Sequence, residues 1–163
     1  MNIVYSHLTP NIDTFAPNWT VQSTAGSDWT LHQIAPYIGR MKTTMARSLI
    51  EQYTKPGDLV IDPFCGCGVI ALEAATRMRN IYAGDLNPYA VLLTKAKLHP
   101  PESLEDAEEK LKIAWKLSLK RFKSQDLRKV PKWVRNFFHP ETLKTALAFR
   151  DICMERDEYF LMA

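Results

Sequence analysis

The spacing of hydrophobic and polar positions predicts alternating helices and strands from residue 43 onward. Apolar residues recur at helical spacing between Thr43 and Tyr53, and Lys55-Pro56-Gly57 ends that helix. The run Asp58–Ile61 follows and is long enough for a short buried strand. Residues 1–30 are polar and show no period, so we expect an irregular N-terminal arm there.

A strand, loop, helix and strand follow one another in the next part of the chain. The segment Asp62–Gly68 cannot form regular structure, and Val69–Met78 has the apolar pattern of a helix. The run Asn80–Gly84 predicts a second strand, and Pro88 suits the first turn of a helix that extends to about Leu98. This βαβ order implies an α/β fold with a parallel sheet and a right-handed crossover.

Beyond residue 100 the pattern becomes helical and charged. We expect a long helix from Ser103 to about Lys123, a basic loop, and a helix from about Pro140 to Arg156. The sequence stops in the apolar run 159–163, whereas natural C-termini are usually polar, so we expect a truncated continuation. The predicted organisation is an arm over 1–30, a βαβ part over 31–100 and a helical basic insert over 101–163.

Composition narrows the class of protein. The 163 residues, 46% of them hydrophobic, suffice for one compact domain, and the net charge of +3 permits a nucleic-acid partner. The first residues do not resemble a signal peptide, and no apolar run approaches the ~18 residues of a membrane span. We therefore expect a cytoplasmic protein with three free cysteines. Because Cys65 and Cys67 lack a second pair of ligands at suitable spacing, we expect no metal site.

The glycine loop and the aspartate after the second strand have the features of a ligand-binding site. Gly66 and Gly68 allow tight turns and a close approach of the main chain to a ligand, and the start of the Val69 helix favours an anionic group. Asp85 lies 23 residues after Asp62, at the tip of the second strand, where an acid can accept both hydroxyls of a ribose. The alternative is an ordinary tight turn followed by an unrelated aspartate.

The spacing of the glycines fits neither the dinucleotide pattern Gly-x-Gly-x-x-Gly nor a phosphate-binding loop that ends in Gly-Lys-Ser/Thr. The string Asp62-Pro-Phe-Cys-Gly-Cys-Gly68 resembles the Asp-Pro-Phe-x-Gly-x-Gly motif of S-adenosylmethionine-dependent amino-methyltransferases. These include DNA enzymes that methylate N6 of adenine or N4 of cytosine. His32–Arg40, Gly84–Pro88 and Pro131–Leu143 resemble further segments of these enzymes. The likeness covers about residues 30–163 and is strongest over 60–88.

The resemblance implies a partial Rossmann-like methyltransferase fold with S-adenosylmethionine as cofactor. Asp85 would hold the ribose, Leu86 and Asn87 would flank the adenine, and Tyr37 would lie near the methionine end. Where the family usually has Thr, this chain has Val69. The full set of expected cofactor-binding residues is Tyr37, Ile38, Asp62, Phe64, Cys65, Gly66, Gly68, Asp85, Leu86 and Asn87.

The catalytic loop of the family is absent from the sequence. Members use Asp/Asn/Ser-Pro-Pro-aromatic to draw the amine toward tetrahedral geometry and to stack on the flipped-out base. The one Pro-Pro pair here stands in His99-Pro100-Pro101-Glu102, which has neither flanking group. With two predicted strands where the class needs about seven, we expect a fragment or, second, a chain that a partner chain completes. No catalytic residue is assigned.

The segment from Lys110 to Arg135 holds ten basic residues and one acid, Asp126, and aromatic residues follow. Basic residues interleaved with aromatics suit contact with phosphates and bases. The alternative is a solvated helix face whose aromatics anchor the insert to the core. We expect double-stranded DNA to contact Lys129, Lys132, Trp133 and Arg135.

Three functions stay open. The first is a DNA N6-adenine or N4-cytosine methyltransferase, alone or beside a restriction enzyme, with direct methyl transfer and no role for Cys65 or Cys67 as nucleophile. The second is an RNA guanine-N2 methyltransferase, which usually has an RNA-binding domain ahead of the glycine loop. The third is a non-catalytic subunit that acts only with a partner.

Overall fold

The structure, a computed structural model, describes residues 30–163, so all but the last residue of the predicted irregular arm lies outside the described residues. Its first part contains η2 (Thr30–Gln33), α1 (Thr43–Tyr53), β1 (Leu59–Asp62), α2 (Val69–Ala75), β2 (Asn80–Ala83) and α3 (Pro88–Leu98). Its second part is helical and contains α4 (Leu104–Arg121), η3 (Phe122–Ser124), η4 (Leu127–Lys129), α5 (Lys132–Arg135), α6 (Pro140–Glu155) and α7 (Tyr159–Met162).

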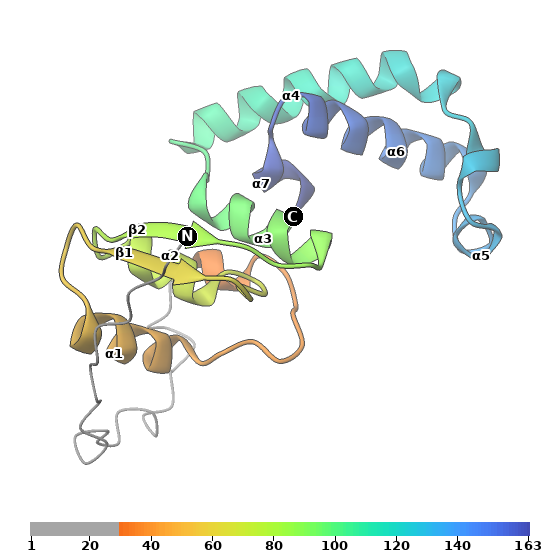
Figure 1. The fold of residues 1–163 in the computed structure, drawn as a ribbon. Coiled ribbons are helices and arrows are strands. Elements are labelled where there is room, and N and C mark those ends of the chain that lie inside the picture. Colours follow the sequence, from red (N-terminus) through yellow and green to blue (C-terminus); the bar gives the residue numbers. More distant parts are fainter. Residues whose placement is uncertain (1–29) are drawn as a thin grey trace, which may run out of the picture.

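A parallel βαβ unit forms the core of the first part (Figure 1). The strands β1 and β2 pair in register, Leu59 opposite Asn80 and Asp62 opposite Ala83. The helix α2 packs against both strands, and α1 and α3 pack against α2. This arrangement confirms the predicted α/β class, with an open sheet of two parallel strands among the described residues.

The two faces of this small sheet differ in burial. Residues on β1 and β2 alternate between exposed and half-buried positions. On the exposed face lie three large apolar side chains, Leu59, Ile61 and Tyr82, which are 60%, 63% and 69% exposed. The sheet therefore has one helix-covered face and one apolar face open to solvent within the described part of the chain.

The second part is a helical extension. The helices α4 and α6 pack side by side, and α7 returns to α3 (Figure 1). A small core forms between them from Ala114, Ile152 and Cys153. The Ser103 hydroxyl accepts a hydrogen bond from the Asp106 amide at 3.1 Å, which confirms the predicted start of α4.

Three details differ from the prediction. Helix α2 was expected to reach Met78 but ends at Ala75, because Met78 takes a left-handed φ of 60° and its carbonyl accepts a hydrogen bond from Gly57. The helix expected to reach about Lys123 ends at Arg121 and continues as the turn η3, and the expected basic loop contains two short helical turns, η4 and α5. Residues 159–162, for which no element was predicted, form α7, and Ala163 packs on the core around Val69 and Leu93.

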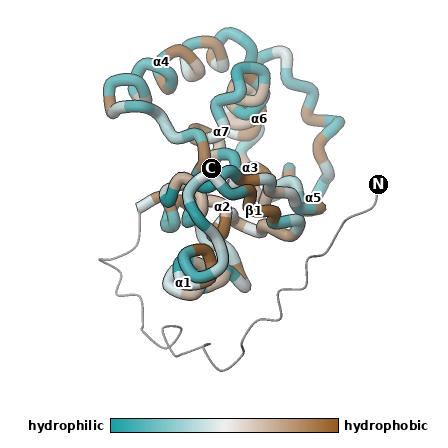
Figure 2. Tube along the Cα trace, turned by 60° about the vertical axis from the view of Figure 1, so that its left-hand side comes forward, coloured by the Kyte–Doolittle hydropathy of each residue, from teal (hydrophilic) through white to brown (hydrophobic). Residues whose placement is uncertain are grey.

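Hydrophilic and hydrophobic residues are mixed along the helices (Figure 2). Among residues 30–163, no helix is both long and apolar enough to cross a membrane.

A buried carboxylate joins α2 to the segments packed on it. Glu73 is fully buried, and its side chain lies 2.9 Å from His32 Nε2 and accepts hydrogen bonds from Arg47 (3.2 Å) and Arg77 (2.5 Å). Burial raises the pKa of Glu73, but the His32 and Arg47 hydrogen bonds and the Arg77 charge outweigh it and lower the pKa overall. The ionised carboxylate is therefore the form that the fold favours.

We expect Gly68→Ala to lower the free energy of unfolding more than Gly57→Ala does. Both glycines have a positive φ, 73° and 92°, where a Cβ costs about 1–2 kcal/mol. At Gly68 the new Cβ would also lie 2.7 Å from Thr94 Oγ1, whereas nothing lies within 4 Å at Gly57. Urea denaturation should show an additional loss of about 1–3 kcal/mol for Gly68→Ala. Equal losses would contradict this reading of the loop.

We expect Glu73→Gln to destabilise the protein at pH 7 by about 1–3 kcal/mol, because it leaves buried donors without their anion. Since the folded pKa of Glu73 lies below its unfolded value, the carboxylate's contribution is present above the unfolded pKa and disappears as the pH falls through the folded pKa. The difference between wild type and variant in urea denaturation should therefore shrink in acid.

Glu51→Gln provides the matched control. Glu51 binds Arg77 at 2.6 Å but is 56% exposed, so its loss should cost no more than the ~1 kcal/mol typical of surface pairs. A Glu73→Gln effect that equals the control, or that stays constant down to pH 3, would overturn the assignment.

Candidate functional site

The glycine loop turns sharply between β1 and α2. Gly66 and Gly68 have φ values of 49° and 73°, in the left-handed region that favours glycine. The Cys65 amide donates to the Gly84 carbonyl at 2.9 Å, and the Thr94 hydroxyl donates to the Gly66 carbonyl at 3.1 Å. The loop is thus tied to the end of β2 and to α3, and it lies at the carboxyl edge of the parallel sheet.

The Asp85 carboxylate is the central group of this edge. Its Oδ2 accepts a hydrogen bond from the Gly66 amide at 2.9 Å, and its Oδ1 accepts one from the Asn87 amide at 2.8 Å. The Asn87 and Gly66 hydrogen bonds lower the pKa of Asp85. Each carboxylate oxygen has a second lone pair, so the ionised side chain can accept two more hydrogen bonds from a ligand.

Asp62 differs from Asp85 in its electrostatics. Burial raises the pKa of Asp62, the Phe64 amide opposes that shift through a hydrogen bond of 3.3 Å, and the charge on Asp85 adds to it. The two acids at the ends of neighbouring strands are therefore tuned in opposite directions. Such a pair suits a ligand that offers hydroxyl donors to one acid and a cationic or polar group to the other.

A cavity of about 260 Å³ opens beside the loop. Tyr37 forms one wall and stacks on Tyr89, with ring centroids 6.4 Å apart and an angle of 25° between the planes. The lining residues are Tyr37, Gly39, Arg40, Met41, Asp62, Phe64, Cys65, Gly66, Cys67, Val69 and Ile70.

The structure brings together most of the residues that the sequence predicts for the cofactor. Five of them line the cavity: Tyr37, Asp62, Phe64, Cys65 and Gly66. Gly68 lies behind it as the residue that precedes α2, and Asp85 is bonded to its rim. Beyond Asp85, Leu86 is 98% exposed and Asn87 caps α3 by accepting the Tyr89 amide. Ile38 is fully exposed and does not line the cavity.

The sequence did not single out four residues that shape this site. Arg40 and Met41 line the cavity; Arg40 is the last residue of the segment quoted for the resemblance, and Met41 follows it directly. Thr94 bonds the loop carbonyl from α3. One helical turn further, Lys97 is 1% exposed, and burial lowers its pKa while the neighbouring Cys67 thiol opposes that shift. The 3-residue spacing of Thr94 and Lys97 places them on one face of α3.

The cysteines of the loop are buried free thiols. Burial raises the pKa of Cys65, against an opposing hydrogen bond with Thr94, so the thiol stays protonated at neutral pH. No cluster of three or more His, Cys, Asp or Glu side chains suitable for a metal occurs within residues 30–163.

The residues expected to contact DNA lie far from this cavity. Lys129, Lys132, Trp133 and Arg135 belong to η4 and α5, at the end of the α4–α6 pair remote from the sheet (Figure 1), and all four are exposed. The alternative that aromatics anchor the insert to the core is wrong for Trp133, which is 67% exposed.

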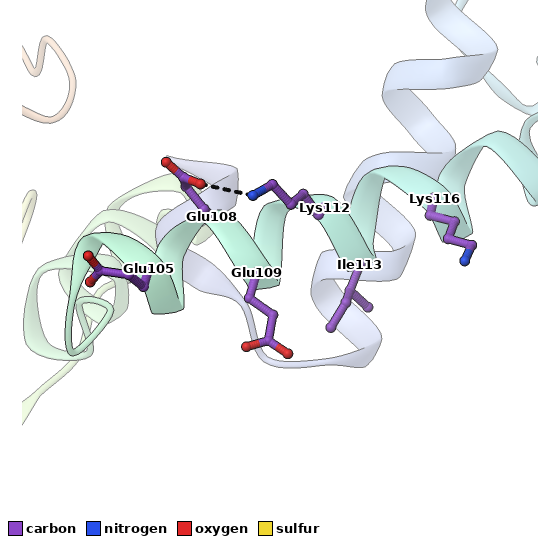
Figure 3. A pocket seen from close by; sticks show the side chains of 6 residues that line it. All are labelled: Glu105, Glu108, Glu109, Lys112, Ile113 and Lys116. Atoms are coloured by element: carbon purple, nitrogen blue, oxygen red, sulfur yellow. Dashed lines mark hydrogen bonds and ion pairs between the residues drawn. The ribbon is translucent and has the colours of Figure 1, made fainter.

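A further hollow of about 530 Å³ runs along α4 (Figure 3). Three glutamates, two lysines and Ile113 line it, and Glu108 pairs with Lys112 at 2.9 Å. All of its lining residues come from one helix face, and none of the predicted site residues is among them.

The chain resembles several known methyltransferases. It is 30% identical over 108 residues to tRNA (guanine(37)-N(1))-methyltransferase 1 of Vitis vinifera, a match that covers 64% of this chain and 17% of that protein. It is 41% identical over 54 residues to tRNA (guanine(6)-N(2))-methyltransferase THUMP3 of Bos taurus, covering 31% of this chain and 11% of that protein. With Type II methyltransferase M.MjaII of Methanocaldococcus jannaschii it shares 28% identity over 68 residues, 42% of this chain and 13% of that protein.

These matches span less than a fifth of the length of those three relatives. No solved structure matches the chain. A family model described as DNA methylase matches residues 9–96, more than half of the chain, and its range includes the glycine loop, Asp85 and most of α3. The chain therefore belongs to the DNA methylase family, whose members transfer methyl groups.

Proposed function

We propose that this chain binds S-adenosylmethionine for methyl transfer to an exocyclic amine of DNA, N6 of adenine or N4 of cytosine. The observation that carries the proposal is the Asp85 carboxylate, hydrogen-bonded to the glycine loop at Gly66 and left with lone pairs for a ribose diol. Residues 31–100 form the cofactor-binding unit in this proposal.

Three features of the site fit the parts of the cofactor. Asp85 accepts the ribose hydroxyls, the exposed Leu86 offers an apolar surface for the adenine, and the cavity beside Tyr37 takes the methionine part. Arg40, also in the cavity lining, suits a carboxylate. Gly66 has no side chain between its backbone and the ligand, and a Cβ there would lie 3.4 Å from the Tyr37 ring.

When bound, S-adenosylmethionine supplies a methyl group on a positively charged sulfur. Asp85 and the cavity beside Tyr37 would hold the cofactor, whose chemistry would be transfer of this methyl group to the amine with release of one amine proton. The protein's part in this step is to orient the methyl group, through Asp85 at one end and the Tyr37 wall at the other. The tetrapeptide that activates the amine in related enzymes does not occur in the 163 residues. We predict that this tetrapeptide is supplied either by another part of the same protein or by a second chain.

The match to the DNA methylase family over residues 9–96 supports DNA as the substrate. The identity of 41% over 54 residues with a tRNA (guanine(6)-N(2))-methyltransferase favours a second candidate, methylation of a guanine in RNA. Both candidates use the same cofactor site. Cross-competition between duplex DNA and tRNA for the chain would separate them.

We expect Asp85→Ala to weaken S-adenosylmethionine binding about 10- to 100-fold in isothermal titration calorimetry, because hydrogen bonds to a charged acceptor are lost. The matched control is Asp58→Ala, which removes the same charge at the opposite end of β1, where Asp58 accepts the Lys55 amide. It should leave the Kd within about threefold. A folded wild-type chain, shown by a cooperative urea transition, that does not bind would refute the proposal, as would equal losses in both variants.

Cys65→Ala should retain cofactor binding within about fivefold. Burial keeps the Cys65 thiol protonated, and direct transfer to an amine needs no covalent intermediate on the protein. Calorimetry measures the affinity, and a thiol reagent should react slowly with Cys65 in the folded wild type. Loss of all binding with an unchanged urea transition would show that the sulfur has a role in the site.

A further inference from the structure

The segment 128–139, which we name the aromatic–basic tip, combines basic with aromatic residues. It contains four Lys or Arg residues and no acid. Because the whole chain has a formal charge of +3, the remaining residues together carry −1. The tip is therefore a cationic segment, and it sits at the end of the α4–α6 pair (Figure 1).

Three of the four cations are free to bind an anion. Lys129, Lys132 and Arg135 are exposed, and within residues 30–163 none of them pairs with an acid. Arg128 differs, because it holds Asp126 through two hydrogen bonds of 2.9 and 3.0 Å that help to lower the pKa of Asp126 to about 2. Arg128 is thus paired with the acid that caps η4, whereas among the described residues Lys132 and Arg135 make no ion pair and Lys129 acts on Asp126 only through its charge.

The tip also exposes three large aromatic side chains. Trp133, Phe137 and Phe138 are 67%, 77% and 50% exposed. Trp133 meets Phe137 edge-on, with ring centroids 6.5 Å apart and an angle of 81° between the planes. Exposed aromatic faces among unpaired cations are suited to stacking bases beside a phosphate backbone.

The outer face of α4 shows what an ordinary charged surface of this chain looks like. There Lys112 pairs with Glu108 at 2.9 Å (Figure 3), and elsewhere on the same helix Lys110 pairs with Asp106 at 2.8 Å. These two cations are compensated by acids one turn away, as in a solvated helix. The tip contains no acid, and it exposes three large aromatic side chains. It therefore differs from this part of α4 both in charge pairing and in aromatic exposure.

We propose that the aromatic–basic tip binds a nucleic-acid strand with unpaired bases. Lys129, Lys132 and Arg135 contact phosphates, and Trp133, Phe137 and Phe138 stack on bases. In Figure 1 both strand arrows point toward the side of the molecule on which α5 lies, so the tip and the carboxyl edge of the sheet share that side. The proposal deepens the nucleic-acid half of the proposed function and is independent of cofactor binding.

A first experiment tests whether the cations of the tip contact phosphates. Fluorescence anisotropy of the 163-residue chain with a labelled 20-nucleotide single strand, and with the matching duplex, is measured without cofactor over a salt series. The triple variant Lys129→Gln, Lys132→Gln, Arg135→Gln should bind the single strand at least tenfold more weakly. Its salt slope should fall by about two, as expected for three lost phosphate contacts. The control Lys112→Gln, Lys116→Gln, Lys120→Gln removes the same charge from α4 and should bind within threefold of wild type.

A second experiment tests whether Trp133 stacks on bases. Trp133→Leu should weaken single-strand binding at least fivefold, whereas Trp133→Phe, which keeps an aromatic face, should restore most of it. The exposure of Trp133 makes both variants tolerable to the fold, and urea denaturation checks this.

Four results would overturn the proposal. They are no binding by the wild type, equal losses in the tip and α4 triple variants, duplex binding as tight as single-strand binding, and an unchanged affinity of Trp133→Leu. Competition by an acidic protein as effective as that by the oligonucleotide would assign the tip to a protein partner instead. Because cofactor is absent throughout, failure here leaves the calorimetric test of Asp85 unaffected.

Discussion

The hydrogen bond from the Gly66 amide to the Asp85 carboxylate joins the glycine loop to the end of the second strand. The other Asp85 oxygen holds the Asn87 amide, and Asn87 in turn caps α3. One side chain thereby fixes the loop, the β2–α3 turn and the start of the helix that carries Thr94. Since Thr94 donates to the Gly66 carbonyl, the amide and the carbonyl of Gly66 are both held, and the cavity beside Tyr37 takes its shape from that arrangement.

Hydrogen bonds of the buried Glu73 hold the helix that follows the glycine loop. Glu73 ties α2, which follows the loop directly, to His32 and Arg47 in the segments that precede β1. The cavity therefore rests on a helix whose position is set by ionic hydrogen bonds as well as by apolar packing. The helical extension is built differently, around a small apolar core between α4 and α6, and it carries the aromatic–basic tip outside the cavity lining. Cofactor binding and nucleic-acid binding thus fall on separate parts of the chain in our account.

Proline and glycine residues at the helix boundaries allowed two helices to be predicted from the sequence. The bounds of α1 and α3 agree with the prediction, because Lys55-Pro56-Gly57 and Pro88 mark their ends through backbone chemistry. The short end of α2 could not be predicted, since it depends on a hydrogen bond between Met78 and Gly57 across the fold. The one-turn helices α5 and α7 are too short to show a period. Of the site, the glycine loop and Asp85 were visible as a motif, whereas the place of Arg40 in the cavity lining and the burial of Lys97 depend on tertiary packing.

The central claim, that Asp85 and the glycine loop bind S-adenosylmethionine, is most directly tested by titrating the ¹⁵N-labelled chain with the cofactor and following backbone amide signals. Our account predicts saturable shifts at Gly66, Leu86 and Asn87, with the amides of Lys112 and Lys132 unchanged. Shifts that cluster along α4, or a titration in which the loop amides of a folded chain do not move, would contradict it.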